Sequence, residues 1–117
     1  MEIYHLKIIV VSAVGIHVDP APETIVKFQT KRNEPMKTRE YGRSLHPFWC
    51  DQFDCLVHEG EEIIFRLEKT NGKELGVAQL IVPHMYKGET SRHKLNMELG
   101  RVLTVKLICD DIEKKEN

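Results

Sequence analysis

The residues best suited to attract a ligand are basic side chains gathered in one stretch of the chain. Six lie within seventeen residues, against two glutamates: Lys27, Lys31, Arg32, Lys37, Arg39 and Arg43. Side chains two apart on a strand share a face, so Lys27 and Lys31 fall together, as do Lys37 and Arg39. Paired as a hairpin, the two segments bring these four cations together. Each would be attracted to an anionic leaflet by about 1 kcal/mol. The alternative interpretation is a solvated strand face.

Patterns typical of catalysis or metal binding are missing from the sequence. It holds no Ser/His/Asp or Cys/His nucleophile motif, no glycine-rich phosphate loop and no paired-carboxylate motif. The 6 histidines are scattered, and Cys50 and Cys55 have the wrong spacing for a closed zinc site. Because free cysteine behaves as a small hydrophobe, we expect the thiols to be buried. The sequence therefore predicts a protein that is not an enzyme and holds no metal or other cofactor.

Composition and charge narrow the class further. The chain has 117 residues, of which 41% are hydrophobic and 30% charged, as expected for one globular domain. Its formal net charge of -1 gives no global pull toward nucleic acid, so we expect no nucleic-acid partner. No signal-peptide pattern occurs, and no apolar run approaches the roughly 18 residues of a membrane span. We expect a cytoplasmic protein that can associate peripherally with membranes.

Short alternating apolar runs separated by turn signals predict an all-β fold. Trp49 and Phe53 are four residues apart and are expected to share a core-facing side. Residues 1–111 are expected to form a single domain, followed by a polar tail over residues 112–117. The predicted strands are 3–11, 24–31, 36–41, 48–57, 62–69, 75–82, 94–99 and 101–109.

Three stretches, in this order, resemble the C2-domain family. The first is LxIxVxxAxxI from Leu6 to Ile16, and the third is IxFxL from Ile63 followed by LGxAxL from Leu75. Between them, HPFWCDQF from His46 is similar to the family's Asn-Pro-x-Trp-Asn-Glu-x-Phe run, with His for Asn and Asp for Glu. The resemblance covers roughly residues 4–109 and implies an eight-stranded antiparallel Greek-key β-sandwich. A strong strand ends the chain and none precedes the Leu6 strand, which is similar to the circularly permuted type II topology.

The resemblance also implies where calcium ligands would lie, because the family holds calcium with clustered aspartates on two loops. Calcium needs several hard oxygen ligands around one ion. Here Lys69-Thr70-Asn71 stands where the family has Asp-x-Asp, which puts a cation in the place of the ion. We therefore expect no calcium cofactor. The remaining, degenerate candidate ligands are Asp19, Glu23, Asn71 and Glu74.

The resemblance implies a binding module, and family members often use the strands equivalent to 24–31 and 36–41 for phosphoinositide headgroups. The sequence therefore favours calcium-independent docking to an anionic phospholipid or phosphoinositide membrane. A protein-interaction module, such as an adaptor or targeting domain in signalling or trafficking, is the main alternative. Calcium-dependent lipid binding with non-standard ligands and a targeting piece of a larger enzyme are two others. No particular lipid, protein partner or oligomeric state is indicated.

Four loop residues could contact lipid apart from the basic stretch. They are Ile16, Val18, Met85 and Tyr86. As apolar or aromatic side chains on expected loops, they are candidates for wedging into a bilayer. Met85 and Tyr86 could equally cap the end of the sandwich.

Overall fold

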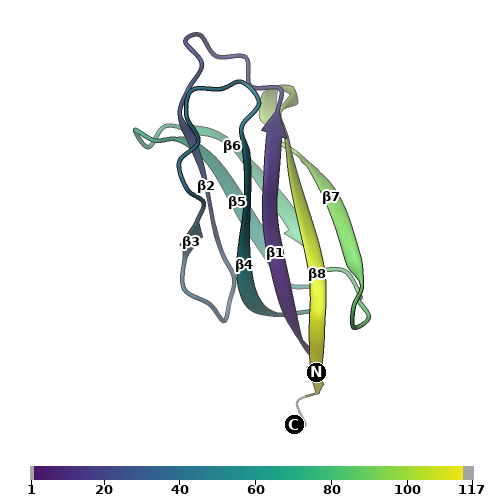
Figure 1. Ribbon diagram of the computed structural model, residues 1–117. Helices are drawn as coiled ribbons and strands as arrows, with labels where there is room; N and C mark the ends of the chain where they lie inside the picture. The colour runs from purple at the N-terminus through teal and green to yellow at the C-terminus, as the bar shows by residue number, and fades with distance from the viewer. Residues whose placement is uncertain (1, 115–117) are drawn as a thin grey trace.

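The computed structural model describes residues 2–114, which form two packed four-stranded antiparallel sheets (Figure 1). Sheet A has the strand order β4-β1-β8-β7 and sheet B the order β3-β2-β5-β6. The elements are β1 (Glu2–Val14), β2 (Thr24–Gln29), β3 (Met36–Lys37), β4 (Phe48–His58), β5 (Glu62–Lys69), β6 (Glu74–Ile81), β7 (Thr90–Asn96), the 3-10 turn η1 (Glu98–Gly100) and β8 (Val102–Lys114). The predicted eight-stranded all-β sandwich is confirmed. No helix within residues 2–114 is long and apolar enough to cross a bilayer.

The first and last strands lie side by side in sheet A (Figure 1). β1 pairs with β8 from Glu2 opposite Lys114 to Val14 opposite Val102, and on its other edge with β4. β1 and β8 therefore occupy the middle of sheet A, as the permuted order implies. The loops after β1 and β3 and the β7–β8 turn gather at the end of the sandwich opposite the start of β1 and the end of β8 (Figure 1).

The core forms where the alternating strands turn their apolar sides toward each other. In β5, Ile63, Phe65 and Leu67 have no exposed surface. Phe28 of β2 packs on Phe65 with ring centroids 4.9 Å apart. Trp49 is buried as predicted, and its indole N–H donates a hydrogen bond to the Thr24 carbonyl at 3.3 Å. Two sheets that interdigitate apolar side chains in this way are stabilised chiefly by removing those side chains from water.

Three strands differ most from their predicted bounds, and β1, which runs to Val14, and β2, which ends at Gln29, differ by less. β3 has two residues instead of 36–41, since the backbone N–H of Arg39 donates to the Asp51 carboxylate at 2.7 Å and not to a strand partner. β7 begins at Thr90, where a polar run looked like a loop, because it is an edge strand paired only with β8. β8 continues to Lys114, so residues 112–114 of the expected tail are strand, and 115–117 lie outside the described residues.

The cysteines divide between core and surface. Cys55 and Cys109 are buried as predicted, and burial raises the pKa of the Cys55 thiol to about 12. The expectation was wrong for Cys50, which is exposed. Its neighbour Trp49 faces the core, so the alternation of β4 turns Cys50 outward.

A close backbone approach fixes the loop end of sheet A. Gly15 has a φ of +80°, and a Cβ there would lie 2.5 Å from the Gly100 carbonyl oxygen. Only glycine fits both conditions at low cost. The end of β1 therefore lies directly against the β7–β8 turn. Within that turn, the Met97 backbone N–H donates a hydrogen bond to the Arg101 carbonyl at 2.8 Å.

Candidate functional site

Three basic residues form a row across the outer face of sheet B. Lys27 in β2 lies directly opposite Lys37 in β3 and, on its other side, opposite Arg66 in β5. Directly opposed residues of antiparallel strands project from the same face with Cβ atoms about 5 Å apart. Lys37, Lys27 and Arg66 are therefore neighbours, and we call them the basic row. Sequence reasoning missed Arg66, although its outward position in the alternating 62–69 segment signalled it.

A groove of about 620 Å³ lies over the basic row. All three cations line it, together with one acidic residue, Glu62, and the apolar Ile64 of β5. Pro35 of the β2–β3 connection and Met36 of β3 line the same groove. The site thus combines positive charge with an apolar patch, in a concavity large enough for a small charged group or a peptide side chain.

Acidic side chains compensate two charges of the row. The Lys27 Nζ lies 3.0 Å from Glu68 Oε1, and the Arg66 Nη1 lies 3.0 Å from Glu74 Oε1. Lys37 makes no ion pair with any residue that the structure describes. An exposed pair of this kind contributes only about 0–1 kcal/mol, so an approaching anion can compete for the cation. The row attracts anions, but less strongly than three uncompensated charges would.

The other cations of the predicted cluster lie elsewhere. Lys31 and Arg32 are in the turn after β2, where the backbone N–H of Lys31 donates to buried Glu61 at 3.0 Å. Arg39 reaches β4, with its Nη2 2.8 Å from Asp51 Oδ1. Arg43 lines a separate groove at the loop end of the sandwich. The expected convergence of four cations is therefore wrong: of those four, only Lys27 and Lys37 are side by side.

Two of the four candidate calcium ligands, Glu23 and Asn71, line the loop-end groove, and the set does not fit calcium. Asn71 Oδ1 accepts the Lys73 backbone N–H at 3.0 Å, and Glu74 is paired with Arg66. Glu23 and Asn71 line the groove beside Arg43 and Lys69, whereas the exposed Asp19 does not line it. Across residues 2–114, no three His, Cys, Asp or Glu side chains are grouped to hold a metal ion. Two cations and one carboxylate make a poor calcium cage, since calcium takes six to eight oxygen ligands.

One serine–histidine contact, which the sequence did not single out, lies on β7. Ser91 Oγ is 2.8 Å from His93 Nε2, and burial lowers the pKa of His93. No carboxylate hydrogen-bonds His93 within the described part of the chain. A catalytic serine needs a base that a third group orients, and this pair lacks that group.

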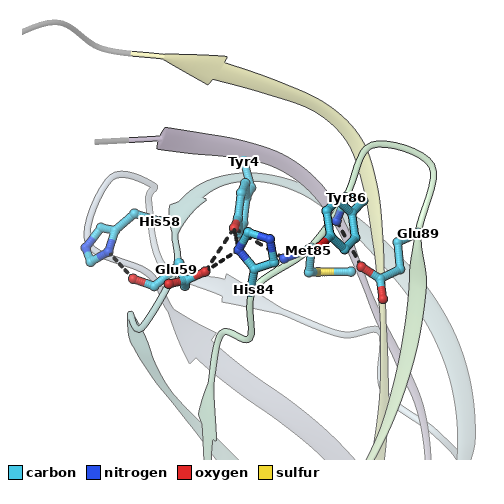
Figure 2. A network of polar contacts seen from close by, with 7 residues as sticks. All are labelled: Tyr4, His58, Glu59, His84, Met85, Tyr86 and Glu89. Carbon is cyan, nitrogen blue, oxygen red and sulfur yellow. Dashed lines mark hydrogen bonds and ion pairs between the residues drawn. The ribbon is translucent and has the colours of Figure 1, made fainter.

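A polar network at the end of the sandwich where β1 begins holds the segment after β6 in place (Figure 2). The Tyr4 hydroxyl accepts the Met85 backbone N–H at 3.2 Å and lies 3.4 Å from Glu59 Oε1. His84 Nδ1 lies 2.6 Å from the same Glu59 oxygen. Burial raises the pKa of the Tyr4 hydroxyl, which therefore stays protonated. These bonds seat Met85 in the core, so we interpret the network as structural.

Burial decides which apolar loop residues can meet a membrane. Ile16 and Met85 are buried, so the expectation that they could wedge into lipid was wrong. Val18 is half-buried, whereas Tyr86 is 68% exposed beyond the end of β6. Sequence reasoning missed Leu99, which is 80% exposed in the β7–β8 turn.

Comparison with known proteins identifies the fold. Neither a protein-family model nor a curated protein sequence matches the chain. Among solved structures, "Structure of a C2 domain" matches with a TM-score of 0.74 at 16% identity, covering 90% of this chain and 96% of that one. A C2 domain of plant Extended Synaptotagmin 1 matches at 0.73 and 21% identity, covering 89% and 92%. Human GIVD cytosolic phospholipase A2 matches at 0.79 and 15% identity; the match covers 98% of this chain but 17% of the phospholipase. The chain has the fold of a C2 domain.

Proposed function

We propose that this protein is a non-catalytic binding module that docks on anionic phospholipid membranes without calcium, through the basic row of sheet B. The observation that carries the proposal is the register that places Lys37, Lys27 and Arg66 next to one another over a groove. Peripheral association with cytoplasmic membrane surfaces is part of the proposal.

The charges of the groove favour a headgroup with several phosphates. Lys27 and Arg66 each have a carboxylate within 3.0 Å, so a ligand must compete with Glu68 and Glu74 for them. A singly charged headgroup competes poorly, whereas a phosphoinositide brings several charges to one place. Each cation near an anionic surface contributes about 1 kcal/mol, which predicts weak, salt-sensitive binding.

The positive charges at the loop end support calcium independence. Arg43 and Lys69 line the groove where a calcium ion would have to bind, and both repel it. The basic row lies on another face and needs no metal ion to carry positive charge.

Vesicle sedimentation tests the proposal. The protein is mixed with phosphatidylcholine vesicles with or without phosphoinositide, in calcium or in chelator. Binding should require the phosphoinositide, be unchanged by chelator and be lost in the double variant Lys37→Glu plus Arg66→Glu. The matched control, Lys94→Glu plus Lys106→Glu on sheet A, should keep most binding. Equal losses in both variants, or binding that anionic lipid does not affect, would contradict the proposal.

The apolar part of the groove favours a second function, recognition of a protein segment. Pro35, Met36 and Ile64 line the groove beside the cations, which suits a peptide with an acidic and an apolar side chain. In that case Ile64→Ser would abolish function in cells while vesicle binding through the basic row stays intact. A vesicle-binding defect that accompanies every functional defect would exclude it.

A further inference from the structure

A second pocket lies at the loop end of the sandwich, away from the basic row. Its volume is about 280 Å³, and it is bounded by the β5–β6 turn, the loop after β1 and the β7–β8 turn. Three basic side chains line it: Lys69 at the end of β5, Lys73 in the β5–β6 turn, and Arg101 immediately before β8. Val18 and Leu99 form its apolar rim.

Arg101 is a buried cation without a counter-ion. The residue is 9% exposed, and its Nη1 donates to the Leu75 carbonyl oxygen. Its Nε is closed to water and has no hydrogen-bond partner, and no described carboxylate forms an ion pair with the guanidinium. Buried arginine is normally paired, because taking its charge out of water is costly. The missing partner is the observation that points to a ligand.

The surrounding charges leave room for an anion. Glu74 and Glu98 are the carboxylates that line the pocket, and Glu74 is already paired with Arg66 outside it. Three cations thus face one uncommitted carboxylate. Guanidinium and ammonium groups together are typical of phosphate recognition, since they supply several charge-assisted donors to its oxygens. The pocket is small for an organic cofactor and suits a single phosphate group.

We infer that this pocket binds a phosphate group, which supplies the counter-ion of Arg101 and is held from outside by Lys69 and Lys73. The phosphate can be a free ion or the exposed headgroup of a lipid such as phosphatidic acid. The site does not depend on the proposed function, because its residues are distinct from the basic row. Leu99 on the rim would meet the bilayer if a lipid supplies the phosphate.

Side-chain NMR of the full chain tests this site. Because Arg101 Nε is shielded from water, its N–H proton should exchange slowly, and its signal should stand apart from those of exposed arginines. The signal is assigned to Arg101 by its absence from the spectrum of Arg101→Lys. Inorganic phosphate should shift that signal with saturation. Lys69→Gln plus Lys73→Gln, at the end of β5 and in the turn after it, should weaken phosphate affinity about tenfold, since exposed charge pairs contribute little each. The control Lys94→Gln plus Lys106→Gln should bind as the wild type does.

Vesicles distinguish the two sources of phosphate. If phosphatidylcholine vesicles containing phosphatidic acid bind the wild type but not the Lys69→Gln plus Lys73→Gln variant, a lipid headgroup occupies the pocket. If the variant affects inorganic phosphate but not vesicles, the pocket binds soluble phosphate and the site stands. A signal unmoved by saturating phosphate, or equal weakening in the control variant, overturns the inference. Neither result affects the test of Lys37 and Arg66.

Discussion

Glu68→Gln should strengthen membrane docking, although it removes an ion pair. The Glu68 side chain is 13% exposed and its Oε1 lies 3.0 Å from Lys27 Nζ, which is the central cation of the basic row. Glutamine keeps the volume and removes the charge, so Lys27 becomes available to a headgroup. One more uncompensated charge near an anionic surface contributes about 1 kcal/mol, which is roughly fivefold in affinity.

The cost to folding should be small. The Lys27 side chain is 47% exposed, and a pair of this kind contributes roughly 0.2–1 kcal/mol to stability. Urea denaturation of the variant checks that the fold is kept. Docking is measured by sedimentation with phosphoinositide vesicles in chelator, at several salt concentrations, because the gain should shrink as screening rises.

Asp110→Asn is the matched control. Asp110 Oδ2 lies 3.6 Å from Lys7 Nζ in a partly exposed pair on sheet A. Its removal changes the net charge by the same amount on the other sheet. An equal gain in Asp110→Asn, or unchanged or weaker docking by a folded Glu68→Gln, would refute a role for the basic row.

Three further predictions concern stability, the thiols and calcium. Gly15→Ala should lower the free energy of unfolding by about 3 kcal/mol in urea denaturation, because of its positive φ and the clash with the Gly100 carbonyl; a loss below about 1 kcal/mol would contradict this. Iodoacetamide at pH 8 should modify exposed Cys50 in the native protein and spare Cys55, because burial raises the pKa of the Cys55 thiol to about 12. Mass spectrometry measures the labelling of each cysteine, and equal labelling would contradict this prediction by showing that the core opens readily. Calcium should give no heat in titration calorimetry and no shift in melting temperature, and either signal would show that the loop end binds it.

The fold was predictable because its main signal is local. The alternation in 62–69 and 101–109 fixes which side chains face inward, and the bounds predicted for 62–69 match β5, whereas β8 continues five residues beyond 109. Trp49 was placed correctly for the same reason. The bounds of β7 were not predicted correctly, because the Thr90–Asn96 strand has a polar outward face and pairs with one strand only, so its sequence pattern resembles a loop.

The candidate site was predicted only in part, because it depends on register across strands. Period two shows that Lys27 points outward, but only the pairing of β2 with β5 reveals Arg66 beside it. In the same way, no local pattern shows that Asp51, twelve residues on, holds Arg39. The buried Arg101 appeared as an ordinary residue at the start of a strand, since its lack of a counter-ion is a tertiary property.

The central claim is that the outer face of sheet B meets the membrane. NMR of the isotope-labelled protein with phosphoinositide vesicles in chelator tests it directly, because residues in contact with a vesicle lose signal intensity. Losses should concentrate on the outward residues of β2, β3 and β5, with Lys37, Lys27 and Arg66 at their centre. Losses centred on the outer face of sheet A, or confined to the loop end, would contradict it.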